Sequence, residues 1–139
     1  MKVEVKTFLN LLSNYKSNQH QIDLLKEKYD LIFYQLRNVK SYPLESVGTT
    51  NQLDIELSKH ELRNKLEKIE TKINLYKAIN KYVDGVLKMM QDDLRKASIE
   101  IYCDNKTYYQ VAPKYNYSSA GLYRQICADI EKALLKALF

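Results

Sequence analysis

Apolar side chains recur every seven residues through the first part of the chain. Between residues 5 and 39, two interleaved sets of positions follow this repeat, and nine of the ten members are apolar or aromatic. The ten positions are Phe8, Leu11, Tyr15, Asn18, Ile22, Leu25, Tyr29, Ile32, Leu36 and Val39. Such a repeat predicts one long helix that packs along another helix. The polar member, Asn18, either fixes the register or oligomer state of that pairing or lies near a solvent-exposed end.

A second repeat of seven occupies residues 53 to about 90. Its members are Ile55, Leu62, Leu66, Ile69, Ile73, Tyr76, Asn80, Val83, Leu87 and Met90. The outer side carries charges of both signs, with Glu61 and Lys65 at the favourable spacing of four residues. Between the two repeats, residues 40–52 contain a proline and a glycine, which predict a loop. We therefore expect residues 1–90 to form a long helical hairpin or coiled coil, paired either within one chain or between chains.

The remaining residues, 91–139, predict a helix-turn-helix domain. Asp92 and Asp93 suit the first turn of a helix because acidic side chains complement the helix dipole. Thr107 is positioned to cap a short helix that runs from Tyr108 to Ala112. The turn and the second helix are marked by Asn116, by the cap Ser118 and by a stripe at every fourth residue, Leu122, Ile126, Ile130 and Leu134. Two helices joined by so short a turn are typical of a motif that places its second helix in the DNA major groove.

The composition favours an all-α fold and a polyanionic partner. The 139 residues include only three glycines and two prolines, too few for the many turns of a β-rich fold. Apolar residues make up 45% of the chain, enough for a core. The net charge of +5 is concentrated at the two ends, since residues 1–40 and 95–139 each carry seven basic against four acidic side chains. A basic terminal domain suits a nucleic-acid ligand.

The chain offers little chemistry for catalysis or metal binding. Cys103 and Cys127 are expected to be buried thiols, and neither is spaced with His20 or His60 as metal ligands are. The sequence has no Gly-rich phosphate loop and no Ser-His-Asp order, so we expect neither an enzyme nor a cofactor. No apolar run approaches the roughly 20 residues of a membrane span, and the first residues do not resemble a signal peptide. We therefore expect a protein that works inside the cell, away from the membrane.

The helix-turn-helix domain resembles region 4 of sigma factors. The residues that carry the resemblance are Val111–Ala112, Asn116–Tyr117–Ser118, Leu122, Tyr123, Ile126, Ala133–Leu134 and Leu138. With two long helices before it, the chain is similar to the phage-encoded late transcriptional regulators of Gram-positive bacteria, the RinA and ArpU-like activators. The sequence departs from the pattern at Pro113, which must stop or bend the first helix of the motif, and at Gly121 in the first turn of the second.

The resemblance implies which residues would contact DNA. Ser119, Ala120, Tyr123 and Arg124 would face the major groove, with Arg124 reaching a guanine edge or a phosphate. Lys106 and Lys114 would neutralise phosphates. The alternatives are that the two lysines are solvated surface residues and that Tyr123 is a half-buried residue at the rim of the core.

The resemblance also implies partners and a location. Double-stranded DNA would be the ligand of a transcriptional regulator in the cytoplasm of a bacterial host. The long helices would dimerise, or form another homo-oligomer, or contact RNA polymerase. An alternative function is an oligomeric assembly protein, such as a phage DNA-packaging adaptor of the small-terminase kind. A high-order ring would favour that adaptor, whereas a dimer or monomer would favour the regulator.

Overall fold

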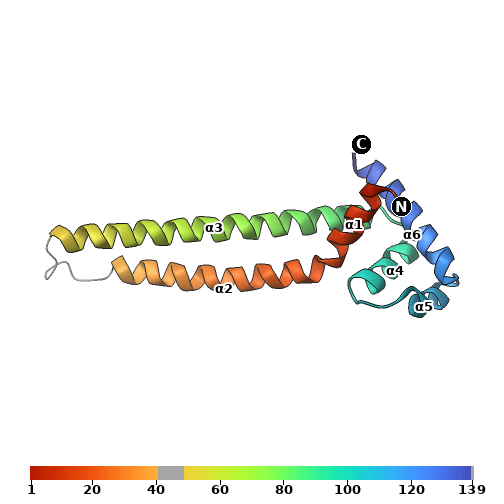
Figure 1. Cartoon of the computed structure of the whole chain (residues 1–139), viewed down its shortest axis with the longest axis horizontal. Helices are drawn as coiled ribbons and strands as arrows, with labels where there is room; N and C mark the ends of the chain where they lie inside the picture. Colours follow the sequence, from red (N-terminus) through yellow and green to blue (C-terminus); the bar gives the residue numbers. More distant parts are fainter. Residues whose placement is uncertain (41–48, 139) are drawn as a thin grey trace. The chain divides into compact units, whose positions relative to one another are not determined.

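Every secondary-structure element in the described ranges is a helix, as the composition predicts. The structure is a computed structural model that describes the backbone of residues 1–40 and 49–138 and the side chains of residues 1–38 and 53–137. The elements are α1 (Val3–Ser13), α2 (Tyr15–Lys40), α3 (Thr49–Lys88), α4 (Asp92–Tyr102), α5 (Tyr108–Val111), the 3₁₀ helix η2 (Ala112–Tyr115) and α6 (Ser119–Leu138) (Figure 1). Within these ranges, none of the helices combines the length and the apolar character that crossing a bilayer requires.

The predicted helix over residues 5–39 is interrupted at Asn14. This residue has φ −92° and ψ 1°, and its backbone N–H is shared between the carbonyl oxygens of Asn10 and Leu11. Helix α2 begins at once, because the N–H of Asn18 bonds to the carbonyl oxygen of Asn14. The sequence contains no glycine or proline at this point, so the break could not be predicted from helix-breaking residues.

Most of the loop predicted at residues 40–52 lies outside the described residues, as do the side chains of Val39 and Leu138. Of that predicted loop, Lys40 belongs to α2 and the residues from Thr49 onward belong to α3. Helix α3 then continues to Lys88, close to the end predicted for the second repeat.

The chain divides into two units that differ from the predicted division at residues 90 and 91. One unit, residues 20–77, contains most of α2 and α3, and we call it the hairpin unit. The other combines residues 1–19 with residues 78–139, and we call it the terminal unit. The first helix of the chain therefore belongs to the same unit as the predicted helix-turn-helix.

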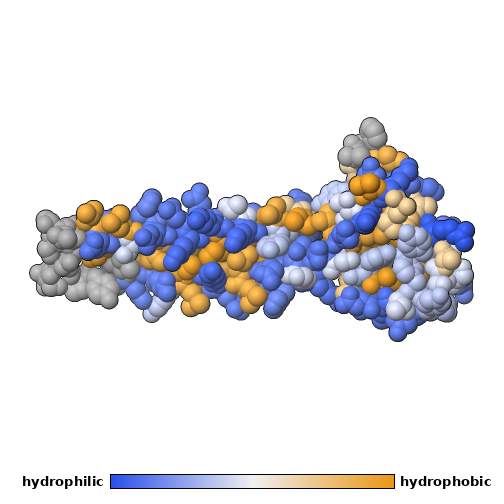
Figure 2. Space-filling view, viewed as in Figure 1, coloured by the Kyte–Doolittle hydropathy of each residue, from blue (hydrophilic) through white to orange (hydrophobic). Residues whose placement is uncertain are grey.

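The hairpin unit is held by apolar residues from both repeats of seven. Its buried members are Ile22, Ile32, Leu36, Leu66, Ile69 and Ile73, with Leu25, Tyr29, Leu62 and Tyr76 packed against them. The two helices thus pair within one chain, as Figure 1 shows. In Figure 2, polar side chains flank an apolar band along this unit. Tyr29 and Phe33 stack with ring centroids 6.4 Å apart at its side.

The terminal unit has a separate core to which α1, α3, α4, α5, η2 and α6 contribute. The fully or nearly buried residues are Val5, Phe8, Leu9 and Leu12 of α1, Val83, Val86 and Leu87 of α3, Met90, Leu94, Ala97 and Ile101 of α4 and its entry, Val111 and Ala112, and Leu122, Ile126, Ile130 and Ala133 of α6. Each repeat of seven is therefore shared between two cores. The early members of the first repeat and the late members of the second enter this core. Most of the other apolar members enter the core of the hairpin unit.

Asn18 and Asn80, the polar members of the two repeats, meet each other. The amide nitrogen of Asn18 donates to Oδ1 of Asn80 at 3.1 Å, and the amide of Asn80 donates to the carbonyl oxygen of Tyr15 at 3.2 Å. Both side chains are buried. Because a polar pair in a helical seam satisfies itself in only one alignment, this pair fixes the register of α2 against α3. The structure supports the first of the two interpretations of Asn18, with its partner in the same chain.

Candidate nucleic-acid interface

The short helix α5, the 3₁₀ helix η2 and α6 form the predicted helix, turn and helix. Pro113 lies within the first two positions of η2, where its missing N–H costs no hydrogen bond but ends the α-helical pattern. The first helix of the motif is therefore α-helical only from Tyr108 to Val111 and tightens afterwards. Asn116 then adopts a left-handed conformation, with φ 64° and ψ 36°, and turns the chain toward α6.

Side-chain caps fix both helix starts, as the sequence predicts. Oγ1 of Thr107 accepts from the N–H of Gln110 at 3.2 Å, and Oε1 of Gln110 accepts from the N–H of Thr107 at 2.9 Å. This reciprocal pair is a capping box. Oγ of Ser118 accepts from the N–H of Gly121 at 3.0 Å. A Cβ on Gly121 would lie 2.8 Å from that oxygen, so glycine at this position avoids a steric clash with the capping side chain.

The predicted apolar stripe anchors α6 to the core. Leu122, Ile126 and Ile130 are fully buried, and Leu134 packs partly buried against the same core. Burying such side chains stabilises the fold by about 1.5–3 kcal/mol each. Val111 and Ala112 join them from the first helix of the motif. The opposite side of the first turns of α6 is consequently free to face a ligand.

The four α6 residues implied in groove contact occupy this free side, although not equally. Ala120, Tyr123 and Arg124 are exposed, whereas Ser119 is half-buried. Nε of Arg124 donates to the carbonyl oxygen of Ala120 at 3.5 Å. Among the described residues, no acidic group forms an ion pair with Arg124, so its charge is available to a ligand.

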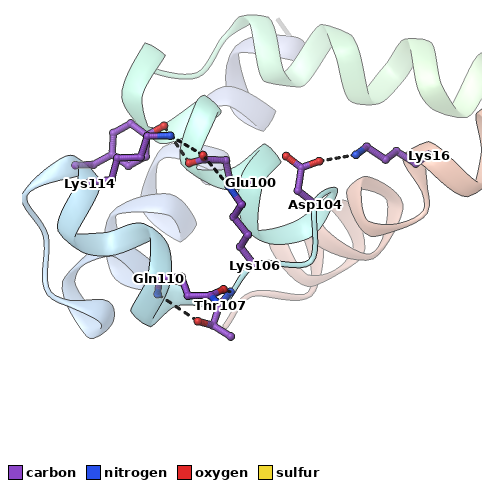
Figure 3. A network of polar contacts seen from close by, with 8 residues as sticks. Lys16, Glu100, Asp104, Lys106, Thr107, Gln110 and Lys114 are labelled. Carbon is purple, nitrogen blue, oxygen red and sulfur yellow. Dashed lines mark hydrogen bonds and ion pairs between the residues drawn. The ribbon is translucent and has the colours of Figure 1, made fainter.

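Both candidate lysines of the motif pair with Glu100, a residue of α4. Nζ of Lys114 lies 2.7 Å from Oε1 of Glu100, and Nζ of Lys106 lies 3.4 Å from the same oxygen (Figure 3). The hydroxyl of Tyr115 donates to Oε2 at 3.1 Å. The hydrogen bond from Lys114 holds the pKa of Glu100 below its usual value, and the same bond raises the pKa of Lys114. The two lysines are thus not simply solvated.

Sequence reasoning missed the role of Glu100. Its distance in sequence from Lys106 and Lys114 is six and 14 residues, which matches no helical spacing. Lys106 reaches Glu100 through the turn that follows α4, where its N–H donates to the Glu100 carbonyl oxygen. Lys114 reaches it because η2 packs against α4, a contact that the local sequence does not reveal.

A cluster of tyrosines supports the start of α6. The rings of Tyr108 and Tyr123 meet edge to face with centroids 5.6 Å apart, and Tyr102 meets Tyr108 in the same manner at 6.2 Å. The hydroxyls of Tyr102 and Tyr108 share a hydrogen bond, and burial raises the pKa of both. Tyr123 therefore combines a packed edge with an exposed one, so the rim alternative and the contact role coexist. Tyr109, next in sequence to Tyr108, is 81% exposed.

The two cysteines are half-buried free thiols. Burial raises the pKa of Cys103 and of Cys127, which makes both poor nucleophiles near neutral pH. In the part of the chain that the structure describes, no group of three or more His, Cys, Asp or Glu side chains could hold a metal ion. Comparison with models of protein families, with curated proteins and with solved structures found no match to this chain.

Proposed function

We propose that this protein is a sequence-specific, double-stranded DNA-binding transcriptional regulator of the phage late-gene activator type. The observation that carries the proposal is the exposed start of α6. There Ala120, Tyr123 and Arg124 project from a helix whose other side is locked into the core. A rigid helix with one unpaired arginine suits insertion into a major groove.

The proposed contacts follow from the chemistry of each side chain. The guanidinium of Arg124 can donate two parallel hydrogen bonds to the O6 and N7 atoms of guanine. The methyl group of Ala120 and the ring of Tyr123 offer apolar contact to a thymine methyl group, and Ser119 offers a hydroxyl. Lys106 lies in the segment between α4 and α5, and Lys114 lies in η2, where their charge would act on phosphates.

The partner of the hairpin unit distinguishes this proposal from the alternative. In the described residues, the seam of the two repeats is occupied within the chain, so a homo-oligomer would use other surfaces. Large apolar residues remain exposed on this unit, namely Leu24, Leu31, Phe33, Tyr34, Leu53, Leu57 and Leu75. That exposure favours the second candidate function, an oligomeric packaging or assembly adaptor. Measuring the solution mass separates the two, because a high-order ring fits the adaptor and a dimer or monomer fits the regulator, in which the hairpin would instead contact RNA polymerase.

Replacing Arg124 and Lys114 together by alanine is expected to weaken duplex binding at least about tenfold, since a bidentate arginine contact is worth about 1–3 kcal/mol. The logarithm of affinity should also fall less steeply with the logarithm of salt concentration. Each phosphate contact that is lost reduces the number of counterions released on binding by roughly 0.9. Fluorescence anisotropy with a labelled duplex, titrated at several salt concentrations, measures both quantities.

The matched control replaces Arg63 and Lys68, two exposed cations of α3, by alanine. That variant loses the same net charge and should bind DNA as the unmodified protein does. Absence of duplex binding by the unmodified protein at low salt would exclude DNA as the ligand. Equal binding by the two double variants would exclude α6 as the reading helix.

A further inference from the structure

One acidic side chain contacts both candidate lysines. The carboxylate of Glu100 accepts hydrogen bonds from Lys106, Lys114 and the Tyr115 hydroxyl, so both of its oxygens are occupied by groups of the motif. Figure 3 shows the carboxylate pointing toward both lysines. Lys106 and Lys114 themselves stay solvent-accessible, with 50% and 61% of their side chains exposed.

We propose that Glu100 acts as an internal competitor for the two lysines and thereby limits binding to DNA of arbitrary sequence, leaving the contacts of α6 to decide where the protein binds. This inference rests on the proposed function and assigns to Glu100 the control of sequence-independent binding at the same site. The ligand with which Glu100 competes is the phosphate backbone of a duplex.

The competition follows from charge and from rigidity. Only 15% of the Glu100 side chain is exposed, and α4, which carries it, is fixed in the core by Leu94, Ala97 and Ile101. Moving the carboxylate away from the lysines would break the hydrogen bonds that it accepts, so it remains a competitor when a phosphate approaches. A phosphate must either take the lysines from Glu100 or bind beside a negative charge, and each course weakens a contact that does not depend on sequence.

Discrimination between sequences is retained because the two kinds of contact are affected differently. Binding to arbitrary sequence depends almost wholly on phosphate contacts, whereas binding to the correct site adds the base contacts of α6. Arg124 has no ion pair among the described residues, so Glu100 leaves its contribution intact. Weakening the phosphate contacts thus lowers the affinity for all sequences and preserves the difference between them.

Glu100→Gln tests the proposal, since glutamine keeps the size of the side chain and an acceptor for Tyr115 but removes the charge. Its affinity for random-sequence duplex at low salt should rise about three- to tenfold. The slope of the logarithm of affinity against the logarithm of salt concentration should become steeper by about one. The control is Asp104→Asn. Asp104 pairs with Lys16 outside the motif, so this variant gains the same net charge at a different place.

Two further variants make each outcome decisive. Glu100→Asp keeps the charge and should bind random duplex as weakly as the unmodified protein, which separates charge from packing. Adding Lys114→Ala to Glu100→Gln should remove most of the gain. Equal affinities and salt slopes for the unmodified protein and Glu100→Gln would overturn the inference about Glu100 but not the proposed function. An equal gain in affinity in Asp104→Asn would do the same. Failure of the unmodified protein and of every variant to bind duplex would overturn the proposed function as well.

Discussion

Phe8→Ala is expected to lower the free energy of unfolding by about 3–5 kcal/mol, the usual cost of removing a buried aromatic ring. Phe8 is 1% exposed and packs in the core that also contains Leu122 and Ile126. Loss of its ring leaves a cavity that the helices around it cannot fill. Equilibrium denaturation in urea, followed by far-ultraviolet circular dichroism, measures the effect.

Phe33→Ala is the matched control for this prediction. Phe33 is also a phenylalanine within a helix, but 45% of it is exposed, and it belongs to the hairpin unit. Its replacement should cost about 1 kcal/mol or less. Near-ultraviolet circular dichroism of the tyrosines around Tyr108 should report the loss of packing in Phe8→Ala and remain unchanged in Phe33→Ala. Equal destabilisation by the two substitutions would contradict the burial of Phe8 in the core of the terminal unit.

Asn18→Leu is expected to destabilise the protein by about 1–3 kcal/mol, because Oδ1 of Asn80 loses its donor while remaining buried. The added apolar surface does not compensate, since leucine would face the amide of Asn80. A thermal or chemical denaturation experiment on the single variant gives the cost directly.

The double variant, Asn18→Leu with Asn80→Leu, should recover stability to that of the unmodified protein or above it, because both polar groups are then gone. Its register is no longer fixed by a polar pair, so its solution mass should become heterogeneous by analytical ultracentrifugation. Additive losses in the double variant would show that the two asparagines act independently, contrary to the hydrogen bond between them.

Local features of the sequence were sufficient to predict most helices and their starts. Asp92 and Asp93 mark the beginning of α4. Thr107 and Ser118 cap the two helices of the motif. The spacing of Leu122, Ile126 and Ile130 identified the buried side of α6. These predictions succeeded because capping and helical periodicity depend on residues within a few positions of each other.

The partner of each helix could not be predicted in the same way. A repeat of seven says that one side of a helix is covered, but it does not say by what. Phe8 and Ile22 belong to the same repeat, yet they enter different cores. The break at Asn14 lies between them, and neither a glycine nor a proline announces it.

The candidate site was predicted only in part for a related reason. The exposure of Ala120, Tyr123 and Arg124 follows from the helical period alone. The pairing of Lys114 with Glu100 depends on how α4 packs against η2, and charge counts along the sequence cannot reveal it. For this reason the count of seven basic side chains in residues 95–139 overstates the number of unpaired cations that the motif presents to a ligand.

The construction of the terminal unit from both ends of the chain bears on the order of folding. Helix α1 is synthesised before α6, which completes the same core, so this unit cannot close its core until α6 has been made. The contacts of the hairpin unit lie between residues 20 and 77, all made earlier. We therefore expect the hairpin to form first and to bring Asn18 and Asn80 together, which shortens the loop that the final core must close. Pulse-labelled hydrogen exchange during refolding should accordingly protect α2 and the middle of α3 before α6.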